Sequence, residues 1–280
     1  MSCEELLRQI GPVLRARDFR LYTQGRGRLV DLWQFGGAAV LGHTPSGVVR
    51  ELKNTAERGL FTPFPHPLEK RFTKALSQLF PDKQYRVYAD DASLRRSLTQ
   101  AGYDPEAPFW DPALGSPLSS DAAPSLWRPF LKEDDPLSFS ASETAPLVIP
   151  IVPWSLAPKV LVFPESLERV RRFPPSDSIS PVLLAGAARS VYDLIAAAPN
   201  RGKAVFPGIQ KALVNSPWRR QGIYLNYAEP LDDASFIRLF LDFLESGFLL
   251  PPYQKAPLIL PGILSPGEEA KLAARLINSR

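Results

Sequence analysis

The spacing of apolar residues predicts helices along much of the chain, because many of them recur with the 3.6-residue period that lines one helix face. Capping signals support the first and the last helix, since Ser2 and Ser265 are each followed three residues later by glutamate, the capping-box pattern. The predicted helices are the stretch after Ser2, Ser46 to Arg58, Pro67 to Phe80, Ala92 to Ala101, Ile179 to Ala198, Gly208 to Asn215, Asp232 or Asp233 to Gly247, and the stretch after Ser265.

Shorter apolar runs between turn residues predict strands. Phe19 to Tyr22 and Leu29 to Phe35 flank the sequence QGRGR, which indicates a hairpin with a Gly-containing turn. Gln84 to Ala89 and Gly222 to Tyr227 alternate between apolar and polar residues, the pattern of half-buried strands.

Two more apolar strands are predicted at Leu147 to Val152 and Lys159 to Phe163. The second run is almost uninterrupted, which is typical of a strand buried on both faces of a parallel sheet. The chain has 30 prolines, and they concentrate between about Pro105 and Pro175. Residues 103–145 are therefore expected to form an ordered loop, held by Trp110 and Trp127 as apolar anchors.

Composition narrows the classes of function. The chain has 280 residues, 45% of them hydrophobic, and a net charge of +4 that is dispersed rather than gathered into a basic cluster, so nucleic-acid binding is not expected. One cysteine, Cys3, and two histidines, His43 and His66, cannot build a disulfide framework or a Cys/His zinc site. The sequence contains no Gly-x-Ser-x-Gly elbow and no Walker or Gly-x-Gly-x-x-Gly motif.

The N-terminus lacks the basic and apolar regions of a signal peptide, and we expect no apolar run to be long enough to span a membrane. These features predict a soluble, cytoplasmic protein that does not bind membranes.

The stretch from Arg28 to Phe61 combines a strand-like segment, two adjacent glycines (Gly36 and Gly37), then Gly42 and His43, and finally a helix. Glycines at such a passage permit positive φ or the close approach of another backbone. A tight turn without further function explains the same pattern.

This stretch resembles the N-terminal segment of class III aminotransferases. The resemblance rests on the order G-R-x-L-V-D-L, G-G, L-G-H, x-P and x-V-V. These are pyridoxal-phosphate (PLP) enzymes of fold type I that include the glutamate-semialdehyde aminomutases, and this segment forms the floor and rim of their active site. Phe240 to Lys271 resembles the small C-terminal domain of the same family.

The resemblance implies an α/β protein: a reduced fold type I large domain around a central, mostly parallel sheet, plus a small α+β domain formed by the two terminal segments. The implied divisions are residues 1–60, an N-terminal segment packing with the C-terminal domain, residues 61–200, the reduced large domain, and residues 201–280, the small C-terminal domain.

The resemblance also implies positions for the cofactor. The family's Ser-Gly-Ser/Thr-Glu-Ala motif, which holds the PLP phosphate at a helix N-terminus, corresponds to the stretch that contains Asp90, Asp91 and Ser93. Ser176 falls where the family has a phosphate-contacting threonine, although a serine in a proline-rich loop is more often an ordinary surface residue. Gly36, Gly37, Gly42 and His43 would complete the pocket. Asp90 and Asp91 also fit as ordinary helix caps, and two carboxylates are poor neighbours for a phosphate dianion.

The catalytic groups of the family are not found. Its Asp-Glu-Val strand end should lie near Val148 to Val152, which runs instead into Pro153 and Trp154, and no lysine precedes a Gly-rich turn. Lys159 is the least unsuitable candidate for a relocated Schiff-base lysine. The leading hypothesis is a shortened, degenerate relative without PLP or transaminase activity that acts as a binding or partner protein.

Two alternatives remain open at this point. One is a PLP-dependent aminotransferase or aminomutase that uses Lys159, and the other is a protein that binds an amine or a cation through Asp90 and Asp91. The expected partner is a second copy of the chain or a full-length aminotransferase. Such a partner would cover apolar loop residues that could otherwise pack on their own domain, namely Phe61, Phe64, Phe109, Trp110 and Trp127.

Overall fold

The chain forms two compact units. The computed structural model describes residues 1–104, 106–115, 124–137, 147–149, 158–163, 168–201 and 205–279. Unit 1 comprises residues 1–44, 130–136 and 198–280, and unit 2 comprises residues 45–129 and 137–197. Unit 1 therefore joins the two terminal segments of the chain, while residues 45–60 group with unit 2.

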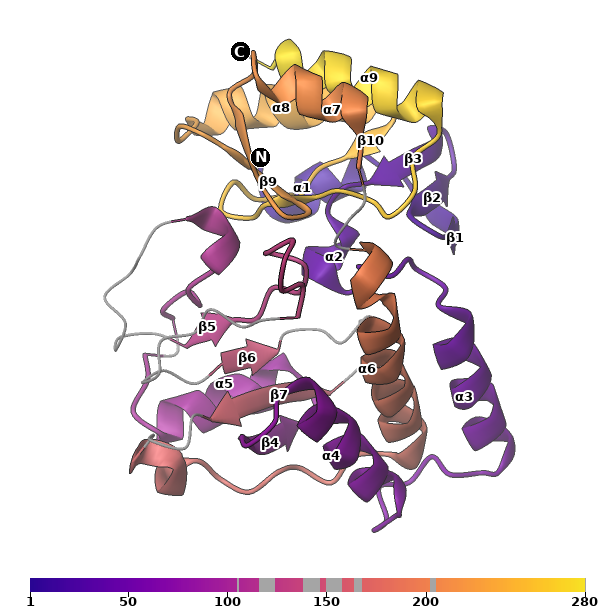
Figure 1. Cartoon of the computed structure of the whole chain (residues 1–280), viewed down its shortest axis with the longest axis vertical. Helices are drawn as coiled ribbons and strands as arrows, with labels where there is room; N and C mark the ends of the chain where they lie inside the picture. The colour runs from indigo at the N-terminus through magenta and orange to yellow at the C-terminus, as the bar shows by residue number, and fades with distance from the viewer. Residues whose placement is uncertain are drawn as a thin grey trace. The chain divides into compact units, whose positions relative to one another are not determined.

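Unit 1 contains a sheet in the order β1-β2-β3-β10 (Figure 1). The predicted hairpin is confirmed, since β2 and β3 pair antiparallel, and β10 from the far end of the sequence pairs parallel to β3. β3 ends at Asp31, four residues before the predicted end, and the backbone at Trp33 is already helical, with φ of −85° and ψ of −40°. The strands are β1 (Val13–Arg17), β2 (Arg20–Thr23), β3 (Gly27–Asp31) and β10 (Phe248–Leu249).

A second sheet in unit 1 has the order β11-β9-β8, with antiparallel pairing throughout. Its strands are β8 (Trp218–Gln221), β9 (Tyr224–Tyr227) and β11 (Leu258–Ile259). β8 was not predicted, because its sequence WRRQ is mostly polar. The helices of this unit are α1 (Cys3–Arg8), the short α2 (Gln34–Gly37), α7 (Pro207–Leu213), α8 (Asp233–Glu245) and α9 (Pro266–Ile277).

The predicted capping boxes are present on α1 and α9, and α8 is capped by Asp232, whose carboxylate accepts the Ser235 N–H. α8 buries one apolar face, which includes Phe240 and Phe243, and α7 packs against α9 (Figure 1). Phe240 and Phe243 belong to the periodic apolar spacing that predicted α8, so that spacing also indicated its buried face.

Unit 2 is built on a sheet in the order β4-β7-β6-β5. Its strands are β4 (Gln84–Tyr88), β5 (Ser125–Leu126), β6 (Leu147–Ile149) and β7 (Lys159–Phe163), and residues 150–152 of one predicted strand lie outside the described residues. The expectation of mostly parallel pairing is corrected for these strands: β7 is antiparallel to both β4 and β6, and only β5 and β6 pair parallel. Every residue of β7 is buried, as predicted, but a run that is apolar on both faces does not encode strand direction.

Helices surround this sheet, and α3 lies beside α6 (Figure 1). Gly47 of α3 illustrates the packing, because a Cβ at this position would lie 2.5 Å from Nε of Arg189 on α6. The helices are α3 (Ser46–Glu57), α4 (Leu68–Leu79), α5 (Asp91–Gln100) and α6 (Pro181–Arg201), with 3-10 turns η1 (Pro112–Leu114) and η2 (Glu168–Arg172).

The proline-rich region contributes core residues to unit 2. Trp127 is buried and packs edge-on against Phe80, with ring centroids 5.1 Å apart, so its predicted role as an anchor is confirmed. Trp110 is half-buried and forms a bridge to Ser125. Residues 116–123 and 138–145 of the predicted loop lie outside the described part of the chain.

Within the described ranges, α6 is the helix that is long and apolar enough to span a membrane, contrary to the expectation that no stretch reached that length. About half of its most apolar stretch, 56%, is buried inside the protein, as in the core helix of a globular fold. A cytoplasmic location stays a prediction.

Candidate cofactor site

The turn between β4 and α5 is built around Asp90. Its backbone is extended, with φ of −153° and ψ of 179°, and its Oδ1 accepts the backbone N–H of Ser93 at 2.8 Å. This is the geometry of an N-cap, which satisfies one of the donors that a helix leaves free at its start. The interpretation of Asp90 as a helix cap is therefore confirmed, and Asp91 is the first helical residue.

A second segment, residues 174–177, runs alongside β4 and reaches the same turn. The Asp177 N–H donates to the Val87 carbonyl at 2.8 Å, and the Val87 N–H donates to Ser176 Oγ at 3.0 Å. The Tyr88 hydroxyl donates to the Pro174 carbonyl at 3.2 Å. Ser176, which the resemblance placed beside the phosphate-binding turn, thus lies next to β4.

Asp177 completes this arrangement, and sequence reasoning missed it. Its Oδ2 accepts the Ala89 N–H at 2.9 Å and the Ser93 hydroxyl at 2.5 Å. Ser93 itself is buried. The only sequence signal was the position of Asp177 next to Ser176, since the residues it contacts lie more than 80 positions away.

Lys159 also lies at this turn. It opens β7 directly opposite Tyr88, and its Nζ is 3.7 Å from Asp91 Oδ1. The Lys159 side chain is buried at 9% exposure, whereas that of Asp91 is 74% exposed. Unit 2 therefore brings together Lys159, Asp90, Asp91, Ser93 and Ser176, five of the nine residues singled out from the sequence.

These residues do not fit the phosphate of PLP. A phosphate dianion at a helix N-terminus needs free N–H and O–H donors. Here the Ala89 N–H, the Ser93 N–H and the Ser93 hydroxyl already donate to carboxylates of the chain itself. Three aspartates, Asp90, Asp91 and Asp177, make the same place electronegative. In the described part of the chain, no group of three or more His, Cys, Asp or Glu side chains is placed to hold a metal ion.

The other four predicted residues, Gly36, Gly37, Gly42 and His43, belong to unit 1. The predicted positive φ is confirmed for all three glycines, with values of 70°, 113° and 95°. A Cβ on Gly42 would lie 3.2 Å from the Asp18 carbonyl oxygen, so this glycine also permits a close backbone approach.

The turn has two further left-handed residues that the sequence did not indicate. Gln34 and Phe35 have φ of 49° and 48°, a conformation that costs each non-glycine residue about 1 kcal/mol or more. Gln34 is fully buried and donates from Nε2 to the Ile259 carbonyl at 2.9 Å, which helps to hold the turn.

Asp31 fixes the same turn from the end of β3. Its Oδ1 accepts the N–H groups of Trp33 and Gln34 at 2.9 and 2.8 Å, and its Oδ2 lies 2.9 Å from His43 Nε2. The His43 N–H donates to the Asp18 carbonyl at 2.6 Å. The interpretation of His43 as a structural turn residue, rather than a general base, agrees with these contacts.

Solved structures similar to this chain are class III aminotransferases. Ornithine δ-aminotransferase of Plasmodium falciparum superposes with a TM-score of 0.68 at 12% identity, over 100% of this chain and 98% of that chain. Acetylornithine aminotransferase of Elizabethkingia anophelis gives 0.63 at 12% identity, over 100% and 99%. A glutamate-1-semialdehyde aminomutase of Pseudomonas aeruginosa PAO1 gives 0.63 at 15% identity, over 95% and 86%.

The architecture is therefore that of the fold type I transferases. Within that class the chain has a class III aminotransferase-like fold, which confirms the resemblance and the fold predicted from the two ends of the sequence. At these identities the likeness establishes the fold alone.

Sequence relatives cover less of the chain. An uncharacterised protein of Treponema pallidum is 35% identical over 114 residues, which are 39% of this chain and 37% of that protein. An uncharacterised protein of Borreliella burgdorferi is 32% identical over 77 residues, 28% of this chain and 29% of that protein. The matches thus span about a third of each relative, and no family model matches the chain.

Proposed function

We propose that this chain is a non-catalytic protein on the class III aminotransferase fold, which does not hold PLP and acts by binding a partner. The observation that carries the proposal is the occupied N-terminus of α5. The donors that could hold a phosphate there are used by Asp90 and Asp177.

Electrostatics supports the same conclusion. To enter this turn, a phosphate would have to displace the Asp177 carboxylate and would still lie near Asp90 and Asp91. Two like unit charges about 4 Å apart near a protein surface repel by roughly 4 kcal/mol. Lys159 lies beside this turn, and its Nζ already pairs with Asp91. The balance of charge therefore disfavours a dianion.

One observation favours a second candidate, an enzyme that uses Lys159. This lysine lies beside the β4–α5 turn, where a relocated Schiff base would have to form. Its burial argues against the idea, since a carbonyl ligand would have to displace surrounding groups to reach Nζ. The proposal that Asp90 and Asp91 bind an amine or a cation has less support, because Asp90 caps α5 and Asp91 pairs with Lys159.

A titration with PLP separates these candidates. Wild-type protein and Lys159→Ala are mixed with PLP, scanned for Schiff-base absorbance, reduced with borohydride and mapped by peptide mass. We expect no saturable absorbance and only scattered labelling of surface lysines, equal in both proteins. Stoichiometric labelling of Lys159 that disappears in Lys159→Ala would replace the proposal with the enzyme.

The partner is proposed to bind over exposed aromatic residues of unit 2. Of the five apolar loop residues expected at an interface, Trp127 is buried, Trp110 is half-buried and Phe109 packs against the core of unit 2 and under Arg95. Phe61 and Phe64 remain 63% and 70% exposed. Large apolar side chains that lie near one another and stay exposed are typical of interaction surfaces.

The assembly is tested by light scattering at micromolar concentration with the wild type and a Phe61→Ser, Phe64→Ser variant. We expect a dimer that the double substitution converts to a monomer, while Val214→Ser, at a position of unit 1 that is 81% exposed, leaves the mass unchanged. A wild-type monomer that persists on concentration excludes the homodimer. A pull-down with a purified class III aminotransferase then decides whether a heterodimer forms.

A further inference from the structure

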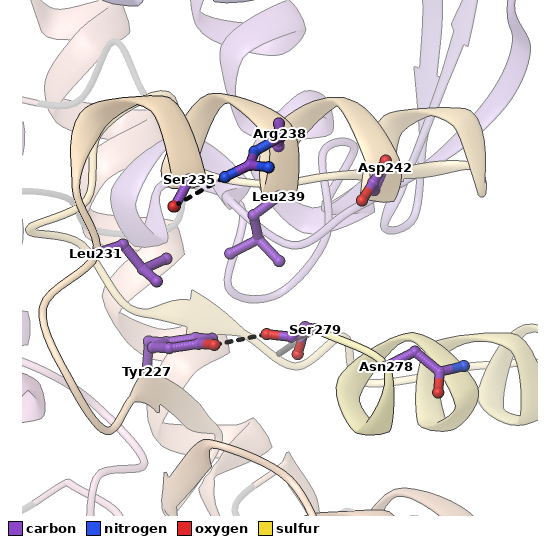
Figure 2. Close-up of a pocket in the computed structure, with 8 residues that line it drawn as sticks. All are labelled: Tyr227, Leu231, Ser235, Arg238, Leu239, Asp242, Asn278 and Ser279. Carbon is purple, nitrogen blue, oxygen red and sulfur yellow. Dashed lines mark hydrogen bonds between the residues drawn. The ribbon is translucent and has the colours of Figure 1, made fainter.

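A pocket of about 290 Å³ opens in unit 1 between α8, the end of β9 and the residues that follow α9. Figure 2 shows Leu231 and Leu239 reaching toward the ring of Tyr227, which forms the opposite wall. This part of the pocket is apolar. Its size suits a small ligand, since it lies at the lower end of the range for ligand pockets.

The polar part of the lining contains one cation and one anion, Arg238 and Asp242, which are one helical turn apart on α8. Residues at this spacing are neighbours and commonly pair when their charges are opposite. No ion pair joins them within the described structure, and the Arg238 side chain instead donates a long hydrogen bond of 3.3 Å from Nη2 to Ser235 Oγ. Both charges therefore line the pocket without neutralising each other directly.

The Asp232 carboxylate just before α8 attracts Arg238 electrostatically, but its hydrogen bonds are directed to Ser235. Asp232 accepts the Ser235 N–H at 2.8 Å and the Ser235 hydroxyl at 3.0 Å as the N-cap of the helix. Among the residues that line the pocket, Arg238 and Asp242 are the charged ones, and both retain hydrogen-bonding capacity for a ligand.

The wall opposite α8 is held rigidly. The Tyr227 hydroxyl donates to the Ser279 carbonyl at 2.5 Å, and Trp218 Nε1 donates to Ser279 Oγ at 2.7 Å. The rings of Trp218 and Tyr227 pack edge-on, with centroids 5.1 Å apart. These contacts fix the end of α9 against β8 and β9, so the pocket is formed before any ligand arrives, which lowers the entropic cost of binding.

We propose that this pocket binds a small zwitterion of the α-amino-acid class with a short aliphatic side chain. The ligand carboxylate would pair with Arg238, its ammonium with Asp242, and its side chain would lie between Leu231, Leu239 and the Tyr227 ring. A zwitterion uses both charges of the pocket and leaves neither unpaired, whereas a simple acid or a simple amine uses one. The proposal does not depend on the proposed function, because the β4–α5 turn lies in the other unit.

The test is calorimetric titration of the full chain with L-leucine, 4-methylpentanoate and 3-methylbutylamine, which share the branched aliphatic group and differ in charge. We expect saturable binding of leucine with Kd on the order of 1 mM or tighter, and at least tenfold weaker binding of the other two. Arg238→Gln and Asp242→Asn should each weaken leucine binding at least tenfold.

Matched controls are Glu245→Gln, an exposed acid on α8 outside the pocket, and Arg275→Gln, an exposed base on α9. Both should bind leucine like the wild type. The proposal is overturned if leucine shows no saturable binding, if the acid or the amine binds as tightly, or if the pocket variants behave like the controls. None of these outcomes bears on PLP, so the two proposals fail independently.

Discussion

Replacing Glu268 by glutamine should remove much of the acid sensitivity of unit 1. Glu268 stands at N3 of α9, and Arg20 of β2 donates to its two oxygens from Nε at 2.9 Å and from Nη2 at 2.6 Å. Arg28 Nη2 lies 3.3 Å from the same carboxylate, and the Ser265 N–H donates to it at 2.8 Å. Two segments almost 250 residues apart in sequence are thus joined by one buried carboxylate.

The magnitude follows from the pKa of Glu268, which is lowered from its ordinary 4.5 to about 2, chiefly by the hydrogen bonds from Arg20 and against the opposing effect of burial. A difference of this size corresponds to about 3 kcal/mol of folding free energy. Because the folded pKa lies below the unfolded one, this stability is present above pH 4.5 and is lost as the pH falls toward 2.

Denaturant unfolding of the wild type and Glu268→Gln between pH 7 and pH 2 measures the effect. We expect the variant to be about 3 kcal/mol less stable at pH 7, with the difference shrinking steadily below pH 4.5. Glu245→Gln, at an exposed position of α8, should follow the wild type at every pH. A constant difference between wild type and Glu268→Gln across this range would refute the reasoning.

Three further substitutions test single contacts. Gly222→Ala should lower the free energy of unfolding by more than about 2 kcal/mol, because φ is 56° and a Cβ would clash with the Phe130 carbonyl oxygen. The control Gly267→Ala, where a Cβ would enter open space, should not destabilise the protein. Arg201→Met should cost about 1 to 3 kcal/mol in denaturant unfolding, because it leaves two buried carbonyls without their donor. Asp177→Ala should speed hydrogen exchange of the Ala89 amide and lower the free energy of unfolding by about 1 kcal/mol. Asp177→Asn keeps an acceptor and should behave closer to the wild type. Unchanged exchange in Asp177→Ala would contradict the assigned hydrogen bond.

The sequence predicted the elements whose signals are local. α4 and α8 carry apolar residues at helical spacing, and α1 and α9 carry complete capping boxes, so each could be found without knowing the fold. β1 and β8 were missed because β1 is mostly exposed and β8 is mostly polar, and neither shows clear alternation. Pairing with a neighbouring strand decides their structure, and a single sequence does not contain that information.

In the candidate site too, the sequence identified residues with local partners and missed those whose partners are distant in sequence. Asp90 was identified as a cap because its partner, Ser93, is three residues away. Asp177 was missed because its contacts depend on residues 174–177 meeting β4, which only the tertiary structure establishes. The left-handed conformations of Gln34 and Phe35 were also missed, since side chains of these types give no local signal for positive φ.

The central claim, that the α5 N-terminus does not accept a phosphate, is tested most directly by ³¹P NMR of PLP during titration with the protein. This signal reports on the phosphate itself and does not depend on whether any lysine forms a Schiff base. We predict that its shift and linewidth at protein excess stay those of free PLP, apart from a small change that does not saturate. A saturable shift or broadening that Asp177→Ala strengthens would contradict the account, because it would place the phosphate where the aspartate now binds.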